Sequence, residues 1–255
     1  MLIDISSVGV VLASCIVCVL YAWFGLCFAS SMIMALFLLG YHDVKYVVAP
    51  VLLTQLCSAM ISSVVKRSIV HRPRTSLKGG AIIGLAALAS FMTAYTVGVK
   101  LPNEYRLATN GMLLLLAALT NLVCREGTRI DADPLGSMIV GIVGGGIKGA
   151  LGGGTTGIMI AIQRLRGVAF DDALFRTVVS HVFICMAAAL PYILAYGIDI
   201  SLLAMMLVGS MIGTVFGAML QRYTNAVNRR RASSAIMALF SALLFFESVE
   251  SALGA

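Results

Sequence analysis

One stretch of the chain, residues 141–157, combines the residue types that an anion site needs. It holds nine glycines, two threonines and one lysine within a long apolar segment. Irregular backbone is unfavourable in lipid unless it lines a cavity, because lipid offers it no hydrogen bonds. Glycines let a ligand approach the backbone closely, and N–H groups at the start of a helix attract anions. We therefore expect an oxyanion to bind at the tip of this stretch, formed by Gly152, Gly153, Gly154, Thr155 and Thr156.

A second set of glycines has a different expected role. They recur at every fourth residue in this stretch and again in a later segment, as Gly141, Gly145, Gly149 and Gly153 and then Gly209, Gly213 and Gly217. Small residues at this spacing let two membrane helices pack closely. We assign these ladder glycines to helix packing. A phosphate-binding P-loop is excluded because Lys148 is not followed by Ser or Thr.

Four polar side chains in the second half could contact the anion. Lys148 lies about one turn before the tip and can supply positive charge, whereas snorkelling to a membrane surface is its alternative role. Arg176 lies near the start of a later apolar segment, where it could also anchor at the surface. His181 lies deeper beside Ser180, and it is a candidate for proton coupling or for ligand binding, against a plain hydrogen-bonded histidine.

The first half offers polar residues at corresponding places. Thr54 and Gln55 lie in the apolar segment that matches the one with His181, and Ser30 and Ser31 fall near the position of Gly157. All four are candidate substrate contacts, with ordinary interhelical hydrogen bonding as the alternative. The six cysteines lie in or at the ends of apolar runs, so we expect small buried hydrophobic residues and no disulfide framework.

The composition identifies the environment in which these residues act. Hydrophobic residues make up 60% of the 255 residues and charged residues 11%, with a mean hydropathy of +1.00. A soluble domain cannot cover that much apolar surface, so we expect an all-α polytopic protein in the lipid bilayer of the plasma or inner membrane. The net charge of +7 resides in short loops, which argues against nucleic-acid binding. Acidic residues lie only in loops or near the termini, so a metal-ion pathway lacks ligands and no cofactor is expected.

Charge-free intervals and loop charges together predict the topology. Five intervals fit one crossing each, which needs roughly 20 residues: residues 46–65, 79–99, 107–124, 177–198 and 200–221. A sixth, residues 232–246, is shorter but can extend past Glu247. Basic loops at 66–78 and 222–231 lack acidic residues and should both be cytoplasmic. Two loops on one side require an even number of crossings between them. Residues 137–163 must then enter and return on one face, as a hairpin of two short half-helices.

The same reasoning makes residues 5–41 another hairpin, turning near residues 24–31, and places both termini outside. Shifting the chain against itself by about 125 residues aligns Gly25 with Gly152 and Gly40 with Gly167. We therefore expect two inverted-topology repeats, each a broken, re-entrant hairpin plus three transmembrane helices. The repeats span residues 1–125 and 134–255, with an inter-repeat loop at 126–133. In such architectures the substrate site lies between the repeats, beside discontinuous helices.

The order of these features resembles that of the TauE/SafE family of sulfite and organosulfur-anion exporters. The resemblance rests on the glycine triplet at 152–154, on Gly167, on the run Phe175-Arg176-Thr177-Val178-Val179-Ser180 and on Gly217-Ala218-Met219-Leu220 before a basic loop. It implies transport of a small sulfur oxyanion or sulfonate, in the direction of export.

The leading interpretation is a secondary transporter of a small anion that works by alternating access, with protons as a candidate coupling ion. Two other classes remain open. An anion channel of the same fold would show a far higher conductance. An intramembrane enzyme has little support, because no serine-hydrolase or HExxH motif is present.

Overall fold

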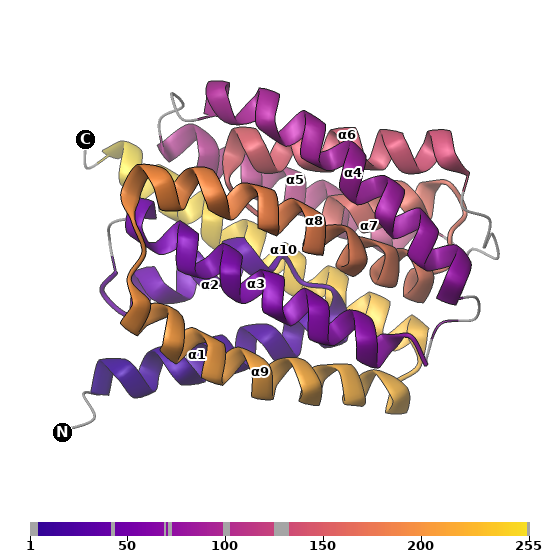
Figure 1. Cartoon of the computed structure of the whole chain (residues 1–255), viewed down its shortest axis with the longest axis horizontal. Coiled ribbons are helices and arrows are strands. Elements are labelled where there is room, and N and C mark those ends of the chain that lie inside the picture. Colours follow the sequence, from indigo (N-terminus) through magenta and orange to yellow (C-terminus); the bar gives the residue numbers. More distant parts are fainter. Residues whose placement is uncertain are drawn as a thin grey trace.

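The protein is built from α-helices that run roughly side by side (Figure 1). The structure, a computed structural model, describes residues 5–41, 44–68, 70, 73–98, 103–124 and 133–253, and within them it contains no β-strand. The helices are α1 (Ile5–Phe24), α2 (Phe28–Leu38), α3 (Val44–Lys66), α4 (Pro73–Gly98), α5 (Asn103–Val123), α6 (Pro134–Leu151), α7 (Thr156–Leu165), α8 (Phe170–Tyr196), α9 (Ile200–Tyr223) and α10 (Ala226–Leu253).

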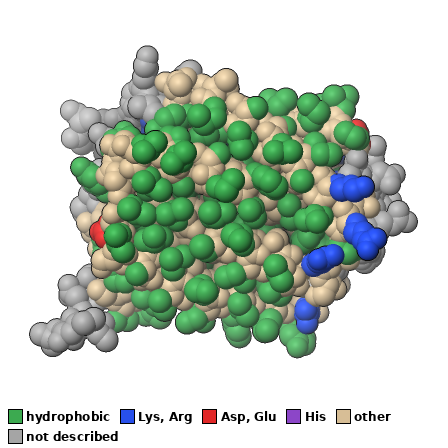
Figure 2. All heavy atoms as spheres, in the orientation of Figure 1, with side chains coloured by type: hydrophobic (Ala, Val, Ile, Leu, Met, Phe, Trp, Pro, Cys, Tyr) green, Lys and Arg blue, Asp and Glu red, His purple; other side chains and the backbone are tan. Residues whose placement is uncertain are grey.

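Six helices are long and apolar enough to cross a membrane, namely α1, α3, α4, α6, α8 and α9. Hydrophobic side chains cover the face seen in Figure 2, and lysines and arginines gather at one end of it. Exposed apolar side chains in such numbers require lipid around them, because monomeric soluble proteins rarely expose large apolar patches. The expected polytopic all-α membrane protein is therefore confirmed. Of the expected crossings, 46–65, 79–99, 177–198 and 200–221 correspond to α3, α4, α8 and α9.

Two segments fold back on themselves, as the loop charges predicted. The first reverses between α1 and α2 at Gly25, whose φ of 74° is left-handed, and Gly9 at the start of α1 lies against Leu39 at the end of α2. The second reverses between α6 and α7 at Gly152, with φ 69°. Asp133 before α6 forms an ion pair with Arg166 after α7, so both ends of this segment lie together.

One part of the hairpin prediction is wrong. The arm before the tip, α6, was expected to be a short half-helix, but it has 18 residues and is long enough to cross. Only α7, with 10 residues, is a half-helix. The same asymmetry holds in the first segment, where α1 has 20 residues and α2 has 11. The glycines of α6 do not break it, because α4 supports the helix along its length.

The ladder glycines pack helices together, as expected. A Cβ at Gly145 would lie 2.0 Å from the carbonyl oxygen of Ala87 on α4, and one at Gly213 would lie 2.2 Å from that of Cys15 on α1. Only glycine permits backbones to approach this closely. The pair α4 and α6 and the pair α1 and α9 are thereby joined along their lengths.

The two basic loops lie at the same end of the molecule. Arg222, at the end of α9, donates a hydrogen bond of 2.7 Å to Ser68, directly after α3. Figure 1 shows the start of α1 and the end of α10 both at the opposite end, at its lower and upper corners. The shared position of the basic loops is thus confirmed, whereas the compartment they face stays a prediction. Most of the expected inter-repeat loop, residues 126–132, lies outside the described residues.

Candidate functional site: the meeting point of two broken segments

The breaks of the two folded-back segments touch each other. The N–H of Gly154 donates to the Ser30 hydroxyl at 2.7 Å. The Cys27 thiol donates to the carbonyl oxygen of Gly154 at 3.2 Å and accepts from the N–H of Gly157 at 3.4 Å. Side chains of the first break thus satisfy backbone groups that the second break leaves open, which irregular backbone away from water requires.

Glycine is needed at this contact for steric reasons. A Cβ at Gly154 would lie 2.3 Å from the Cβ of Cys27. One at Gly153 would lie 2.5 Å from the side-chain nitrogen of Asn110 on α5. Gly152 ends α6 in a left-handed conformation that favours glycine, and the Tyr192 hydroxyl lies nearby. Each of the three glycines at the tip is therefore needed for its own reason: two by close contacts and Gly152 by its left-handed backbone.

The N-terminus of α7 is less open than expected. Sequence reasoning predicted free N–H groups there, but those of Gly154 and Gly157 are already bonded to Ser30 and Cys27. The polar groups without a partner are hydroxyls instead. Thr155 and Thr156 are buried, and neither hydroxyl has a hydrogen bond among the described residues. Buried unpaired groups of this kind are uncommon and suit a ligand or an ordered water.

Lys148 is the charged residue of this region. Its side chain is only 2% exposed, and its amine donates to the side-chain oxygen of Gln55 on α3 at 2.8 Å. Among the described residues Lys148 forms no ion pair, so a neutral amide is its hydrogen-bond partner. Its position in the last turn of α6 is favourable, because the carboxyl end of a helix dipole is negative. The alternative of snorkelling does not fit this burial.

The other predicted contact residues on α3 and α8 differ in whether their polar atoms already have hydrogen-bond partners. His181 is fully buried; its Nδ1 lies 3.4 Å from the Tyr21 hydroxyl, and its Nε2 has no partner among the described residues. The hydroxyl of Thr54 is likewise buried and unpaired. Ser180 donates to the carbonyl oxygen of Thr177 in its own helix at 2.7 Å. Ser180 and His181 therefore do not form a nucleophile–base pair.

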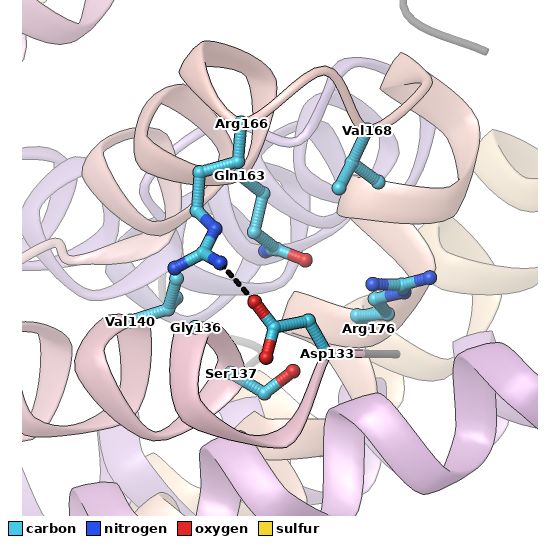
Figure 3. Close-up of a pocket in the computed structure, with 8 residues that line it drawn as sticks. All are labelled: Asp133, Gly136, Ser137, Val140, Gln163, Arg166, Val168 and Arg176. Atoms are coloured by element: carbon cyan, nitrogen blue, oxygen red, sulfur yellow. Dashed lines mark hydrogen bonds and ion pairs between the residues drawn. The ribbon is translucent and has the colours of Figure 1, made fainter. Parts of the chain in front are cut away.

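Two predicted residues do not join the group around Lys148. The hydroxyl of Ser31 donates to the carbonyl oxygen of Cys27 at 2.9 Å and stabilises the first break. Arg176 lines a separate pocket with Asp133 and Arg166, beside the start of α6 (Figure 3). The start of α6 at Pro134 and Lys148 are roughly 21 Å apart along the helix at 1.5 Å per residue. Arg176 thus lies at the basic end rather than at the tip.

Three residues at the meeting point were missed by sequence reasoning. Cys27 was read as a small hydrophobic residue, yet its thiol bonds two backbone groups of the other half. Tyr21 was not singled out and faces His181. Asn110 packs against Gly153, and an amide inside an apolar helix was a signal that could have identified it.

These features define a multi-pass membrane protein with a buried lysine near the contact between two broken segments. Over residues 10–244, nearly its whole length, the sequence matches the family model described as sulfite exporter TauE/SafE. The chain therefore belongs to the TauE/SafE family of membrane transporters, and the resemblance in its motifs is confirmed. No curated protein and no solved structure matches the chain.

Proposed function

We propose that this protein is a secondary transporter that exports a small sulfur oxyanion or organosulfonate, such as sulfite, across the plasma or inner membrane by alternating access. The observation that carries the proposal is Lys148, buried with a neutral Gln55 as its partner. A buried positive charge is unfavourable unless a negative charge pairs with it. A substrate anion is the natural partner.

The proposed site uses groups that lie around the two breaks. The Lys148 amine would bind an anion oxygen, and the unpaired hydroxyls of Thr155 and Thr156 would donate to the others. Gln55 now offers its side-chain oxygen to Lys148. An anion in that place would require Gln55 to present its amide N–H groups instead. In the empty site, the side-chain oxygen of Gln55 therefore takes the place of a substrate oxygen at the Lys148 amine, and the substrate displaces it.

Two inverted repeats supply the movement in this proposal, and helix pairing supports them. The contact of α1 with α9 has a counterpart in α6 with α4, while α3 packs on α8 and α5 on α10. The aligned glycines also agree: Gly25 and Gly152 have positive φ, and so do Gly40 and Gly167. Rocking of one repeat against the other would expose the site to each face in turn.

The test is transport by purified protein in proteoliposomes, using ³⁵S-labelled sulfite. Lys148→Met should weaken sulfite affinity about 10- to 100-fold, the value of one hydrogen bond to a charged group. Lys78→Met is the matched control, because Lys78 is an exposed lysine on α4. Equal effects of the two substitutions would remove Lys148 from the site.

The substrate class has its own test. Thermal stabilisation of the purified protein should be compared for sulfite, thiosulfate, sulfoacetate, taurine and sulfate. The anion that fits between the repeats should raise the unfolding temperature most, because ligands stabilise the state that binds them. Absence of a response to every anion would refute the proposal.

A further inference from the structure

A small pocket lies at the basic end of the molecule, apart from Lys148. Its polar lining comes from Asp133 and Ser137 at the start of α6, Gln163 of α7 with Arg166 after it, and Arg176 of α8 (Figure 3). The two arginines lie on opposite sides of the space, and Asp133 lies between them. The Asp133 carboxylate forms an ion pair with Arg166 in this space, so it occupies the place that an anion would take.

We propose that this pocket is a second anion site, in which a small oxyanion that retains a hydrogen, such as hydrogen sulfite, displaces Asp133 from Arg166. The inference rests on the proposed function for its substrate class. The ion pair is accessible, because the Arg166 and Asp133 side chains are 30% and 32% exposed. Arg176 is 2% exposed and forms the inner wall.

The size of the pocket explains why Asp133 has to move. Its inner cavity is about 20 Å³, and one water needs roughly 10–15 Å³ on this measure. An oxyanion of sulfur is larger than one water, so it fits only when the carboxylate leaves. The carboxylate can do so without unfolding α6. Its Oδ1 caps the helix at the N–H of Leu135, and its Oδ2 pairs with Arg166.

Gln163 defines which oxyanion suits the pocket. Its amide nitrogen is used three times, including a bond of 2.9 Å to the Thr177 hydroxyl. Its side-chain oxygen is buried without a partner and points toward the space between Asp133 and Arg176. An acceptor in this place needs a donor, and the O–H of hydrogen sulfite supplies one while its oxygens pair with the arginines. A sulfonate has no such hydrogen.

Displacement of Asp133 would also act on the helices. Asp133 and Arg166 join the two ends of the folded-back segment α6–α7, whose other end carries Lys148. An anion in the pocket thus releases the contact that fixes α7 against the start of α6. The pocket lies at the basic end of the molecule, and from there the same ion would move toward Lys148 at the other end of α6.

The experiment is calorimetric titration of the full purified chain with sulfite, in the Lys148→Met background to isolate the pocket. Adding Asp133→Asn should tighten binding about two- to fivefold, because a solvent-accessible ion pair competes weakly. Asparagine keeps the helix cap. Adding Arg166→Gln should weaken binding several-fold, and methanesulfonate should bind more weakly than sulfite.

The outcomes separate this site from the central one. If Lys148→Met abolishes all sulfite binding while the wild type binds one ion, the pocket proposal is overturned and the central site stands. If Lys148→Met leaves binding unchanged and Arg166→Gln removes it, the pocket stands and the central site falls. Asp133→Asn and Arg166→Gln without effect on the dissociation constant, or methanesulfonate as tight as sulfite, would also overturn the proposal.

Discussion

Gly154→Ala tests the contact between the two breaks directly. The added Cβ would lie 2.3 Å from Cys27 Cβ and 2.8 Å from the Ser30 hydroxyl oxygen. The Ser30 hydroxyl can rotate away, but the Cys27 Cβ is fixed to its backbone, so the breaks must separate. Overpacking costs about 1–3 kcal/mol, and loss of the bond from the Gly154 N–H to Ser30 adds about 1 kcal/mol. We expect a loss of about 2–4 kcal/mol in all.

The assay is thermal unfolding in detergent, followed by transport in proteoliposomes. For a chain of this size, the loss corresponds to a fall of about 4–16 °C in unfolding temperature. Gly146→Ala is the matched control, because a Cβ at Gly146 has no neighbour within 4 Å. It should be neutral or stabilising, since alanine favours a helix over glycine by about 1 kcal/mol.

A second substitution tests whether Cys27 is the residue that the new Cβ at position 154 meets. Cys27→Gly removes the two Cys27 atoms that the new Cβ meets, so it should be less destabilising in the Gly154→Ala protein than in the wild type. The double-mutant cycle then reports a favourable coupling between the two positions. The reasoning is refuted if Gly154→Ala unfolds at the same temperature as Gly146→Ala, or if the cycle shows no coupling.

Three further predictions concern packing, orientation and coupling. Gly213→Ala should lower the unfolding temperature by several degrees, because its Cβ would lie 2.2 Å from the Cys15 carbonyl oxygen; stability equal to that of Gly146→Ala would contradict the close packing of α1 on α9. Tags at the two termini should both be labelled from outside intact cells, and a protected carboxyl terminus would overturn the orientation. His181→Asn should abolish sulfite-driven proton movement, recorded with a pH dye inside liposomes, if the unpaired Nε2 carries the proton; unchanged proton flux would exclude His181.

Much of the topology was predictable because it follows from charge and length. Two basic loops at one end force residues 137–163 to return, and the ion pair of Asp133 with Arg166 confirms that return. The break positions were also predictable, since Gly25 and Gly152 have the positive φ that glycine favours. The length of α6 was not predictable, because whether glycines break a helix depends on the helix that packs against them. Here α4 packs against them.

The contacts of the site were harder to predict, because they join residues from different halves of the chain. The pairing of Lys148 with Gln55 and of Gly154 with Ser30 required the two halves to be placed together. Sequence reasoning selected all four residues, but it could not identify which pairs meet. Cys27 was missed because a thiol in an apolar run is indistinguishable from packing until its backbone partners are known.

In the proposed function, the charge of the site also predicts the direction of transport. With an anion bound, the charge of Lys148 is balanced, so the loaded centre is nearly neutral. The empty centre carries the lysine charge, and a charge moved through the membrane potential is worth about 2.3 kcal/mol per 100 mV. A potential that is negative inside draws the empty, positive centre toward the cytoplasm. The empty transporter would then favour the state that faces its substrate, and release outside would follow from reorientation of the loaded form.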